Sequence, residues 1–291
     1  MSHPIAESEL ILNPDGSVYH LHLRPEQLAG NIIVVGDQGR VENVSAHFDK
    51  VEHRASNREF VTHTGTFKGQ RFTVLSTGIG TDNIDIVLNE LDALVNIDLG
   101  SRTIKERKTS LRIVRIGTSG ALQGDIPVDS FVASSHGMGL DGLLNYYAGL
   151  DLCDEAPIAN AFMQHAGWMK GMPYPYVVKG SETLLQAIAH DQIQGITATA
   201  PGFYGPQGRQ LRLAPALPDL NEKLGSFSHD GHRVTNFEME TSALYGLGKL
   251  LGHDCATICA IIANRVARKY SQNYKATVDD LIRLVLERMA V

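Results

Sequence analysis

Arginines stand beside glycine-rich turns at the ends of two apolar segments. Arg40 follows the apolar run 31–36, and Arg115 lies within the run 111–116, just before Thr118. Glycine lets a backbone approach a ligand closely, and a guanidinium donates two parallel hydrogen bonds to an oxyanion. Together with the Thr118 hydroxyl, these side chains predict a phosphate or carboxylate site. For Arg115, the alternative of a structural arginine paired with a buried carboxylate stays open.

No nucleotide-binding fingerprint covers these turns. The sequence contains no G-x-x-x-x-G-K-[ST] loop, and Gly78 and Gly80 do not begin a G-x-G-x-x-G motif. A Walker-type loop and a Rossmann site are therefore excluded, which argues against a nicotinamide-dependent enzyme.

A second cluster combines aromatic, amide and guanidinium side chains. Phe203 and Tyr204 precede a Gly-Pro turn that leads to Gln207 and Arg209. An amide offers one acceptor oxygen and two donors, and a guanidinium offers donors alone. The pair could complement the edge of an imide-like ring, although a surface turn has the same composition.

A third cluster places two carboxylates around a methionine, at Glu238, Met239 and Glu240. Residues 238–251 are predicted to be helical, so both carboxylates would favour the helix dipole at its first turn. A carboxylate also accepts hydrogen bonds from sugar hydroxyls. Spacing alone does not choose between these roles.

Alternating strands and helices would position the three clusters. Continuous apolar strands with helices between them indicate a sheet covered on both faces, hence an α/β fold in a single domain. In such sheets ligands bind beyond the carboxyl ends of the strands. We expect the third strand to stop at Gly117, and the last helix to begin at Thr277 with a capping box completed by Asp280. Apolar runs predict strands at 31–36, 71–76, 111–116, 130–134, 195–200 and 255–263, and periodicity predicts helices at 82–98, 181–191, 238–251 and 277–289.

The composition excludes several classes of protein. The chain has 291 residues, 43% of them hydrophobic and 20% charged, and a formal net charge of -6. These values are typical of a globular protein without a chain-wide basic surface for nucleic acid. We find no signal peptide and no membrane-spanning segment, so we expect a cytoplasmic protein with neither a membrane nor a nucleic-acid partner. Cys153, Cys255 and Cys259 lack the clustering of a zinc site or a disulfide framework, and predict buried thiols.

In this order, the clusters resemble the nucleoside phosphorylase family, and specifically its hexameric uridine phosphorylases. The similarity runs from about Tyr19 to the C-terminus and leaves residues 1–18 as an N-terminal extension to a phosphorylase domain at 19–291. The matching stretches are Tyr19-His20-Leu21, Gly36-Asp37 with Arg40-Val41, Ser56-Asn57-Arg58-Glu59-Phe60, Ser76-Thr77-Gly78-Ile79-Gly80, Arg115-Ile116-Gly117-Thr118-Ser119-Gly120-Ala121, Gln207 with Arg209, Glu238-Met239-Glu240 and Ala263-Asn264-Arg265.

The resemblance implies a role for each cluster. Phosphate would bind the first, the base the second and ribose the third, with Arg58 and His20 contributed by a neighbouring subunit. The implied phosphate-binding residues are Gly36, Arg40, Arg58, Arg115 and Thr118, the base-binding residues are Phe203, Gln207 and Arg209, and the ribose-binding residues are His20, Glu238, Met239 and Glu240.

The resemblance also implies a fold, an assembly and a reaction. The fold would be a three-layer domain with a mixed, partly barrel-like sheet flanked by helices, assembled as a homo-hexamer of three dimers. The reaction would be the reversible phosphorolysis of uridine to uracil and ribose 1-phosphate, with inorganic phosphate as co-substrate and neither a metal nor another cofactor. Gln207 and Arg209 match the uracil-reading pair, and Asn264 stands where purine-cleaving relatives place an aspartate, so both features favour uracil.

Alternatives within and outside the superfamily stay open. A purine nucleoside phosphorylase would prefer an acid at position 264, and a nucleosidase would not need Arg40, Arg58 and Arg115 together. A nucleoside-binding protein without catalysis is the alternative from another class.

Three segments depart from the family pattern. Asp82-Asn83 replaces the usual Pro-Ser, and Glu59 and Asn83 are the only side-chain matches to the ligands of an interface cation in some relatives. The sequence therefore does not predict that cation here. Residues 98–109 look like an insertion, for which we expect a surface loop or a frayed helix end.

Overall fold

The protein is described by a computed structural model that covers residues 3–291. The strands are β1 (Asn31–Val35), β2 (Lys50–Asn57), β3 (Phe60–Phe67), β4 (Gln70–Ser76), β5 (Ile97–Asp98), β6 (Thr103–Ile104), β7 (Arg112–Ala121), β8 (Phe131–Gly139), β9 (Val177–Lys179), β10 (Ile193–Thr199), β11 (Ser228–His229), β12 (His232–Glu238), β13 (Asp254–Asn264) and β14 (Lys269–Tyr270). The helices are α1 (Gln38–Ser45), α2 (Thr81–Asn96), α3 (Leu150–Cys153), α4 (Ala156–Ala166), α5 (Glu182–Ala189), α6 (Leu220–Ser226), α7 (Thr241–Leu251) and α8 (Tyr274–Met289), with 3-10 turns η1 (Pro25–Gln27), η2 (Leu143–Tyr146) and η3 (Gly205–Gln207).

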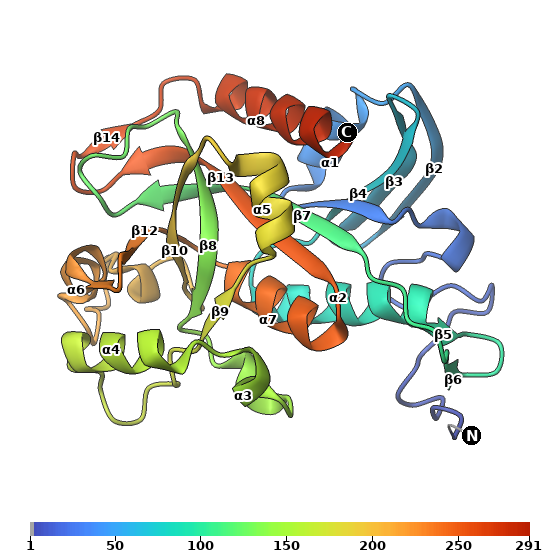
Figure 1. Cartoon of the computed structure of the whole chain (residues 1–291), viewed down its shortest axis with the longest axis horizontal. Helices are drawn as coiled ribbons and strands as arrows, with labels where there is room; N and C mark the ends of the chain where they lie inside the picture. The colour runs from blue at the N-terminus through green and yellow to red at the C-terminus, as the bar shows by residue number, and fades with distance from the viewer. Residues whose placement is uncertain (1–2) are drawn as a thin grey trace.

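The main sheet is mixed and partly closed into a barrel (Figure 1). Its order is β11-β12-β10-β8-β13-β7-β1-β4-β3-β2, and because β12 also pairs with β7, the path from β12 to β7 returns to its start. Strands β1, β4, β7 and β13 pair in parallel, whereas β12 runs antiparallel to β7. The α/β fold with a mixed, partly barrel-like sheet flanked by helices is therefore confirmed.

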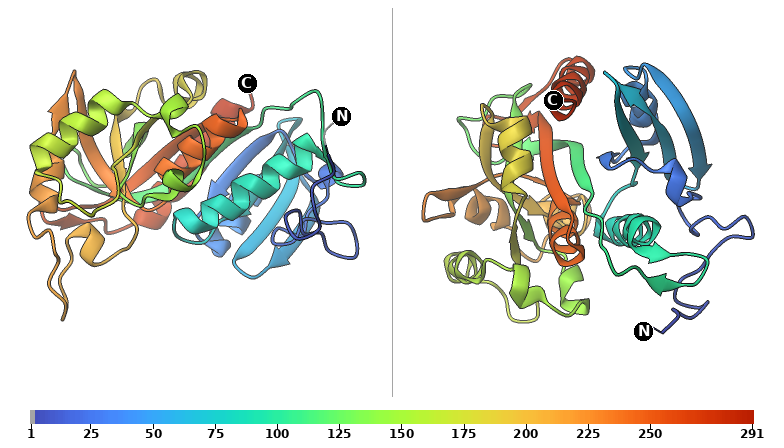
Figure 2. Two further views of the ribbon diagram at one scale, coloured as in Figure 1. Left: turned by 90° about the horizontal axis from the view of Figure 1, so that it is seen from below. Right: turned by 45° about the vertical axis from the view of Figure 1, so that its right-hand side comes forward.

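The alternation of side chains along β1 explains the two helical layers. Ile33 and Val35 point to one face, where they pack in a core with residues of α1, α5 and α8. Ile32 and Val34 point to the other face and pack with residues of α2 and α7. Both faces are covered, so the strand consists of apolar residues without polar alternation. Figure 1 shows α8 above the sheet and α2 and α7 below it, and Figure 2 shows the same layers from two further sides.

Strand β7 continues through Gly117 to Ala121, so the prediction that it stops at Gly117 is wrong. It keeps its parallel partner β13 to the end, and Gly120 pairs with Phe237 of β12. Glycine is required at position 117 because a Cβ there would lie 2.2 Å from Nη1 of Arg115 and 2.7 Å from Sγ of Cys259. The glycine therefore makes room for a guanidinium within a continuous strand.

The structure corrects the predicted starts of two helices and the expected form of residues 98–109. Glu238 still belongs to β12, and helix α7 begins at Thr241. Helix α8 begins at Tyr274, and the Thr277 hydroxyl donates to Oδ1 of Asp129 at 2.8 Å, which excludes the expected capping box. The insertion at 98–109 contains the small hairpin β5–β6, which is more regular than the expected loop.

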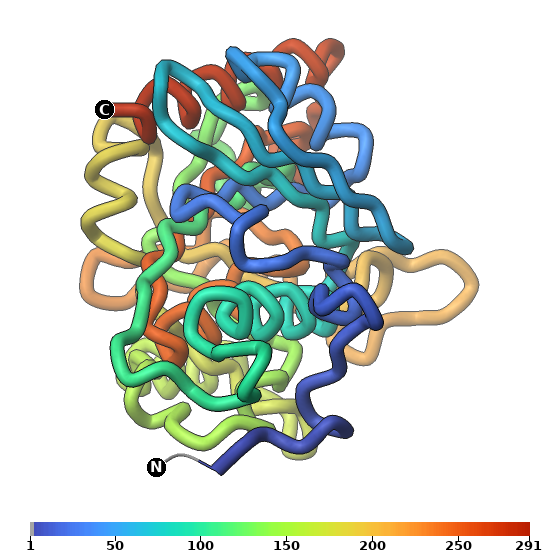
Figure 3. Tube along the Cα trace, turned by 90° about the vertical axis from the view of Figure 1, so that its right-hand side faces the viewer, coloured from blue at the N-terminus to red at the C-terminus, as the bar shows by residue number. Residues whose placement is uncertain are grey.

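The N-terminal residues pack against this hairpin. The backbone N–H of Ile5 donates to the carbonyl of Arg102 at 2.8 Å, and the Arg102 guanidinium donates to the carbonyl of Leu10. Figure 3 shows the segment passing the hairpin and then helix α2. The domain boundary between residues 18 and 19 stays a prediction.

The predicted burial of the thiols is confirmed, because Cys153, Cys255 and Cys259 are all free and buried. Within residues 3–291, no helix combines the length and the apolar character needed to cross a bilayer.

Candidate active site

A cavity of about 840 Å³ opens at the carboxyl ends of β1, β4, β12 and β13. Its position agrees with the rule for open α/β sheets. All of the predicted site residues line it except His20 and Arg58. Those lining it are Gly36, Arg40, Arg115, Thr118, Phe203, Gln207, Arg209, Glu238, Met239 and Glu240.

Arg115 lies between two buried carboxylates in this cavity. Its Nη1 is 3.1 Å from Oε2 of Glu238, and its Nη2 pairs with Oε2 of Glu240. Burial opposes the charge, but the carboxylates of Glu240 and Glu238 raise the pKa of Arg115, so the guanidinium stays charged. Arg115 is therefore paired with buried carboxylates, and its role in binding phosphate stays a prediction. Within the described chain its Nε atom is buried without a hydrogen-bond partner, and a buried donor of that kind is seldom left unpaired.

Arg40 supplies positive charge without a direct ion pair in the described chain, although the Asp37 carboxylate acts on it from a greater distance. It lies on α1, whose first turn is capped by the Asp37 side chain accepting from the N–H of Gly39. The guanidinium donates to the carbonyl of Ile116 at 3.2 Å and has no acidic group within ion-pair distance in residues 3–291. Burial and the charge of Arg115 lower the pKa of Arg40. Two neighbouring guanidiniums with one unpaired charge favour an anionic ligand.

The two carboxylates of the third cluster differ in their partners. Glu238 accepts from the Thr199 hydroxyl at 2.9 Å and from the backbone N–H groups of Glu240 and Thr241 at the start of α7. Its oxygens are therefore committed to the fold and to Arg115. We expect the ribose role predicted for Glu238 to be indirect.

Glu240 is held by a backbone group from the start of α2 and by Arg115. Its Oε1 accepts from the N–H of Gly80 at 2.8 Å, and Gly80 has φ of 103°, a conformation that glycine adopts without strain. Burial raises the pKa of Glu240, the charge of Arg115 lowers it, and the adjacent Glu238 raises it again. Glu240 thus presents a carboxylate to the cavity with its orientation fixed by the backbone.

The second cluster forms a connected polar edge. The Arg209 guanidinium donates to Oε1 of Gln207 and lies 3.7 Å above the centre of the Phe203 ring. Gln207 is 5% exposed, so this side chain is buried, although the neighbouring Phe203 and Tyr204 are exposed as in a surface turn. Its carbonyl accepts from Nη2 of Arg265 at 3.0 Å.

Sequence reasoning gave no role to two further residues that line the cavity, Arg265 and Tyr270. Arg265 follows the end of β13 directly. A charged residue just after a buried strand was the signal used for other strand ends, and it could have identified Arg265. Tyr270 comes from the short strand β14, for which the sequence carried no signal.

Asn264 does not line the cavity. Its amide donates to the carbonyls of Gln123 and Ile126 at 2.9 and 2.7 Å, and its Oδ1 accepts from the N–H of Ala267 at 2.7 Å. The side chain is 2% exposed and fully used in joining loops. Asn264 therefore does not face the cavity, whereas Gln207 and Arg209 do, and the preference for uracil stays a prediction.

Tyr19, His20 and Arg58 form a group outside the cavity, which we call the outer cluster. Arg58 lies at the tip of the β2–β3 hairpin with φ of 52°, and its guanidinium is 5.9 Å from the centre of the Tyr19 ring. The amide of Asn57 donates to the carbonyl of His20 at 2.9 Å. The single chain holds these residues together but does not bring them to its own cavity.

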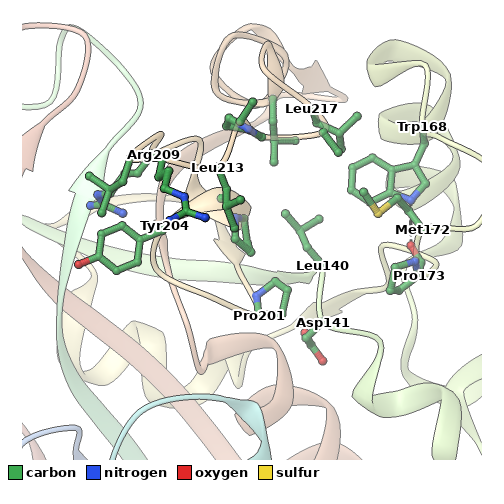
Figure 4. Close-up of a pocket in the computed structure, with 18 residues that line it drawn as sticks. Leu140, Asp141, Trp168, Met172, Pro173, Pro201, Tyr204, Arg209, Leu213 and Leu217 are labelled. Atoms are coloured by element: carbon green, nitrogen blue, oxygen red, sulfur yellow. Dashed lines mark hydrogen bonds between the residues drawn. The ribbon is translucent and has the colours of Figure 1, made fainter.

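A second, apolar hollow of about 710 Å³ lies beside the first (Figure 4). Leu213 and Leu217 border it on one side, and Trp168 and Met172 border it on the other. Arg209 lines both spaces. The hollow lacks a converging set of polar groups, so the polar cavity is the better candidate for chemistry.

Metal ligands are sparse near the cavity. Glu59 and Asn83, the side-chain matches to the cation ligands that the family resemblance implies, both line it. In residues 3–291 no group of three or more His, Cys, Asp or Glu side chains could hold a metal ion. Whether the protein works without a cation or cofactor stays a prediction.

Comparisons with known proteins give a consistent result. Residues 31–290 match the phosphorylase superfamily. A uridine phosphorylase of Thermococcus kodakarensis is 29% identical over 89% of this chain and 81% of its own length. A uridine phosphorylase of Haemophilus influenzae is 30% identical over 87% of this chain and 88% of its own. The crystal structure of a Trypanosoma brucei nucleoside phosphorylase, described as showing uridine phosphorylase activity, aligns with a TM-score of 0.86 and 30% identity, covering 96% of this chain and 99% of that one.

Proposed function

Because the chain belongs to the phosphorylase superfamily, we propose that it catalyses the reversible phosphorolysis of uridine to uracil and ribose 1-phosphate. The observation that carries this proposal is the presence, in one cavity, of the unpaired positive charge of Arg40 and the polar edge formed by Gln207 and Arg209. The first fits an anionic nucleophile, and the second fits an imide-like base.

The phosphate would bind beside Arg40, Arg115 and Thr118. Arg40 supplies charge, the Nε–H of Arg115 supplies a donor without a partner in the described chain, and Thr118 supplies a hydroxyl. Holding the dianion against the sugar converts a bimolecular encounter into an oriented step. A phosphate oxygen attacks C1′ as the bond from C1′ to N1 of the base breaks.

The base leaves with the bonding electron pair, so negative charge grows on the uracil. Gln207 and Arg209 would donate hydrogen bonds to that charge as it develops, which stabilises the transition state more than the ground state. The Arg209 guanidinium is already aligned by the Phe203 ring and carbonyl. The uracil anion is then protonated, and the new phosphate ester releases the proton of the hydrogen phosphate, so water only carries the proton between them.

The ribose would lie between these two groups. Glu240, fixed by Gly80 and Arg115, would accept hydrogen bonds from the 2′- and 3′-hydroxyls, with Met239 against the sugar ring. A carboxylate near the sugar also favours the cationic character that C1′ acquires.

We propose that the active enzyme is a homo-oligomer, and specifically a hexamer of three dimers. The position of His20 and Arg58 supports this, because one chain holds both outside its own cavity. Arg58 would complete the phosphate site of a neighbour, and His20 would contact the 5′-hydroxyl there. We place the enzyme in the cytoplasm, in nucleoside catabolism and pyrimidine salvage, which its free, buried thiols support.

Absorbance of uridine incubated with the purified protein, with and without phosphate and beside an inosine control, tests the proposal. We expect loss of uridine only when phosphate is present. Cleavage without phosphate would indicate a nucleosidase, and cleavage of inosine alone would indicate a purine enzyme. Binding of uridine without cleavage would indicate a nucleoside-binding protein.

A further inference from the structure

One carboxylate organises the chain around His20. Both oxygens of Glu90 accept from the backbone N–H of His20, at 2.9 and 3.0 Å, and Oε2 also accepts from the N–H of Leu21 at 2.8 Å. The Nδ1 atom of the His20 ring lies 2.6 Å from Oε1 of Glu90. Glu90 is thus bonded to the backbone and to the ring of the same residue.

The environment of this pair keeps the ring in one orientation. The side chains of His20 and Glu90 are 25% and 16% exposed, so the pair is largely covered. The Tyr19 ring meets the His20 ring edge to face at 4.8 Å, and Phe60 does so at 6.3 Å. These contacts restrict rotation of the imidazole about its side-chain torsions.

The contact also determines the tautomer. An ionised carboxylate only accepts hydrogen bonds, so Nδ1 must carry the proton that it shares with Glu90. In the neutral ring Nε2 is then an acceptor, because the hydrogen bond made by one ring nitrogen sets the state of the other. No hydrogen bond within the described chain involves Nε2 of His20.

We propose that Glu90 is a positioning residue, which fixes the orientation and tautomer of His20 so that Nε2 accepts a hydrogen bond from the 5′-hydroxyl of the nucleoside in a neighbouring subunit's cavity. This inference rests on the proposed function. It assigns a task to a carboxylate that does not line the cavity of its own chain.

Helix α2 gives the arrangement a rigid base. The helix carries Glu90, and it begins directly after Gly80, whose N–H holds Glu240. One continuous helix therefore holds a group that serves the cavity of its own chain and a group that serves the cavity of a neighbour.

The test compares uridine with 5′-deoxyuridine, which lacks the hydroxyl. For the wild-type protein we expect kcat/KM to be about tenfold higher for uridine, the worth of one hydrogen bond to a well-placed acceptor. Glu90→Gln should lower kcat/KM for uridine by a similar factor and leave 5′-deoxyuridine unchanged. If Glu90 had only a structural role, Glu90→Gln would lower kcat/KM for both substrates together.

A double-mutant cycle separates action through His20 from action elsewhere. His20→Ala should remove the preference for uridine, and adding Glu90→Gln should cause no further loss. Asp92→Asn is the matched control, because Asp92 lies on the same helix and contacts another ring, with Oδ1 3.3 Å from Nε2 of His253. It should leave the substrate ratio unchanged.

Each outcome decides the proposal. If His20→Ala removes the preference but Glu90→Gln retains it, or if the two losses add, Glu90 is not a positioning residue. If the wild type cleaves uridine and 5′-deoxyuridine equally, the role of His20 fails and the inference falls with it. If it cleaves neither, the proposed function itself fails. Should Glu90→Gln not assemble, Glu90→Asp keeps the charge and shortens the side chain, and a partly reduced ratio is then expected.

Discussion

The cavity and the outer cluster obtain their geometry by different means. In the cavity, Arg115 and Glu240 are each 4% exposed and are fixed by burial, Arg115 within β7 and Glu240 between the end of β12 and the start of α7. In the outer cluster, Arg58 is exposed at a hairpin tip, and His20 is held by hydrogen bonds to Glu90 and Asn57. A single chain thus pre-organises groups that lie outside its own cavity. In the proposed oligomer, changes in the cavity should be felt within one subunit, whereas changes in the outer cluster should be felt in a neighbour.

Arg115→Ala should have the largest effect of the changes considered. It removes a phosphate-facing donor and leaves Glu238 and Glu240 facing each other without a cation. We expect kcat/KM for phosphate to fall by about a thousandfold, and the unfolding free energy to fall by about 3 kcal/mol or more. Steady-state kinetics at varied phosphate and chemical denaturation measure these effects. Arg115→Lys, which keeps the charge, should recover part of the stability, and unchanged phosphate kinetics in Arg115→Ala would refute the anion site.

Gln207→Ala should have the second-largest effect and should spare phosphate. The change removes the base-edge amide and frees the Arg209 guanidinium from one of its acceptors. We expect kcat/KM for uridine to drop by about 50-fold, as for loss of a hydrogen bond to a developing charge, with the KM for phosphate retained. Equal losses for both substrates would mean that the two parts of the cavity are not separate.

Arg58→Ala should have a smaller effect and lower kcat/KM by about tenfold, because an exposed arginine contributes less than a buried one. Its distinguishing property is the behaviour of mixed oligomers. If Arg58 acts across an interface, co-expressing Arg58→Ala with Arg115→Ala chains under two tags should restore activity. A neighbour's Arg58 would then complete the cavity that retains Arg115.

If the activity of the mixed oligomers does not exceed the summed activity of the two parent variants, Arg58 acts within its own chain and not across an interface. The matched control mixes Gln207→Ala with Arg115→Ala chains. Both of these changes lie in the cavity itself. A pairing between a cavity and an outer residue should therefore recover more activity than a pairing of two cavity residues.

Asn264→Asp should have the smallest effect on catalysis. The amide does not line the cavity, so the ratio of uridine to inosine cleavage should not change. An aspartate cannot donate to the carbonyls of Gln123 and Ile126, so the unfolding free energy should fall by about 1–3 kcal/mol. Thermal or chemical denaturation and an inosine assay check both parts, and a gain of inosine cleavage would return position 264 to the site.

The sequence predicted the cavity well because its residues follow strands that are recognisable from apolar runs. Arg40 follows β1, as the rule for strand ends requires. Arg115 was also placed near the cavity, although it lies within β7 and not at the expected strand end. The same reasoning did not separate Glu238 from Glu240, because a helix pattern was extended back over the end of β12. Which carboxylate caps the helix and which faces a ligand depends on one boundary.

Long-range packing decided what the sequence could not. The residue type of Gly117 predicted the end of a strand. In the structure this glycine lies inside the strand, because Arg115 and Cys259 leave no room for a Cβ there. Asn264 matched a motif position. Its side-chain orientation, however, is set by hydrogen bonds to loop carbonyls more than a hundred residues away in the sequence. The positioning role proposed for Glu90 depends on its contact with His20, which lies 70 residues away in the sequence, so no local sequence pattern predicts it.

The rate at which the three buried cysteines are modified should report how fast the fold opens locally. Burial raises the pKa of the Cys153 and Cys255 thiols, and it raises the pKa of Cys259 to about 11, so all three remain protonated at neutral pH. Only a thiolate attacks a disulfide reagent. Cys255 and Cys259 lie in β13, one at the edge of the α2–α7 core and the other beside Arg115. A thiol reagent added to the native enzyme should therefore modify Cys255 and Cys259 only as fast as β13 becomes exposed, whereas Cys153 reports on exposure of α3. Ligands that close the cavity should slow the modification of Cys259.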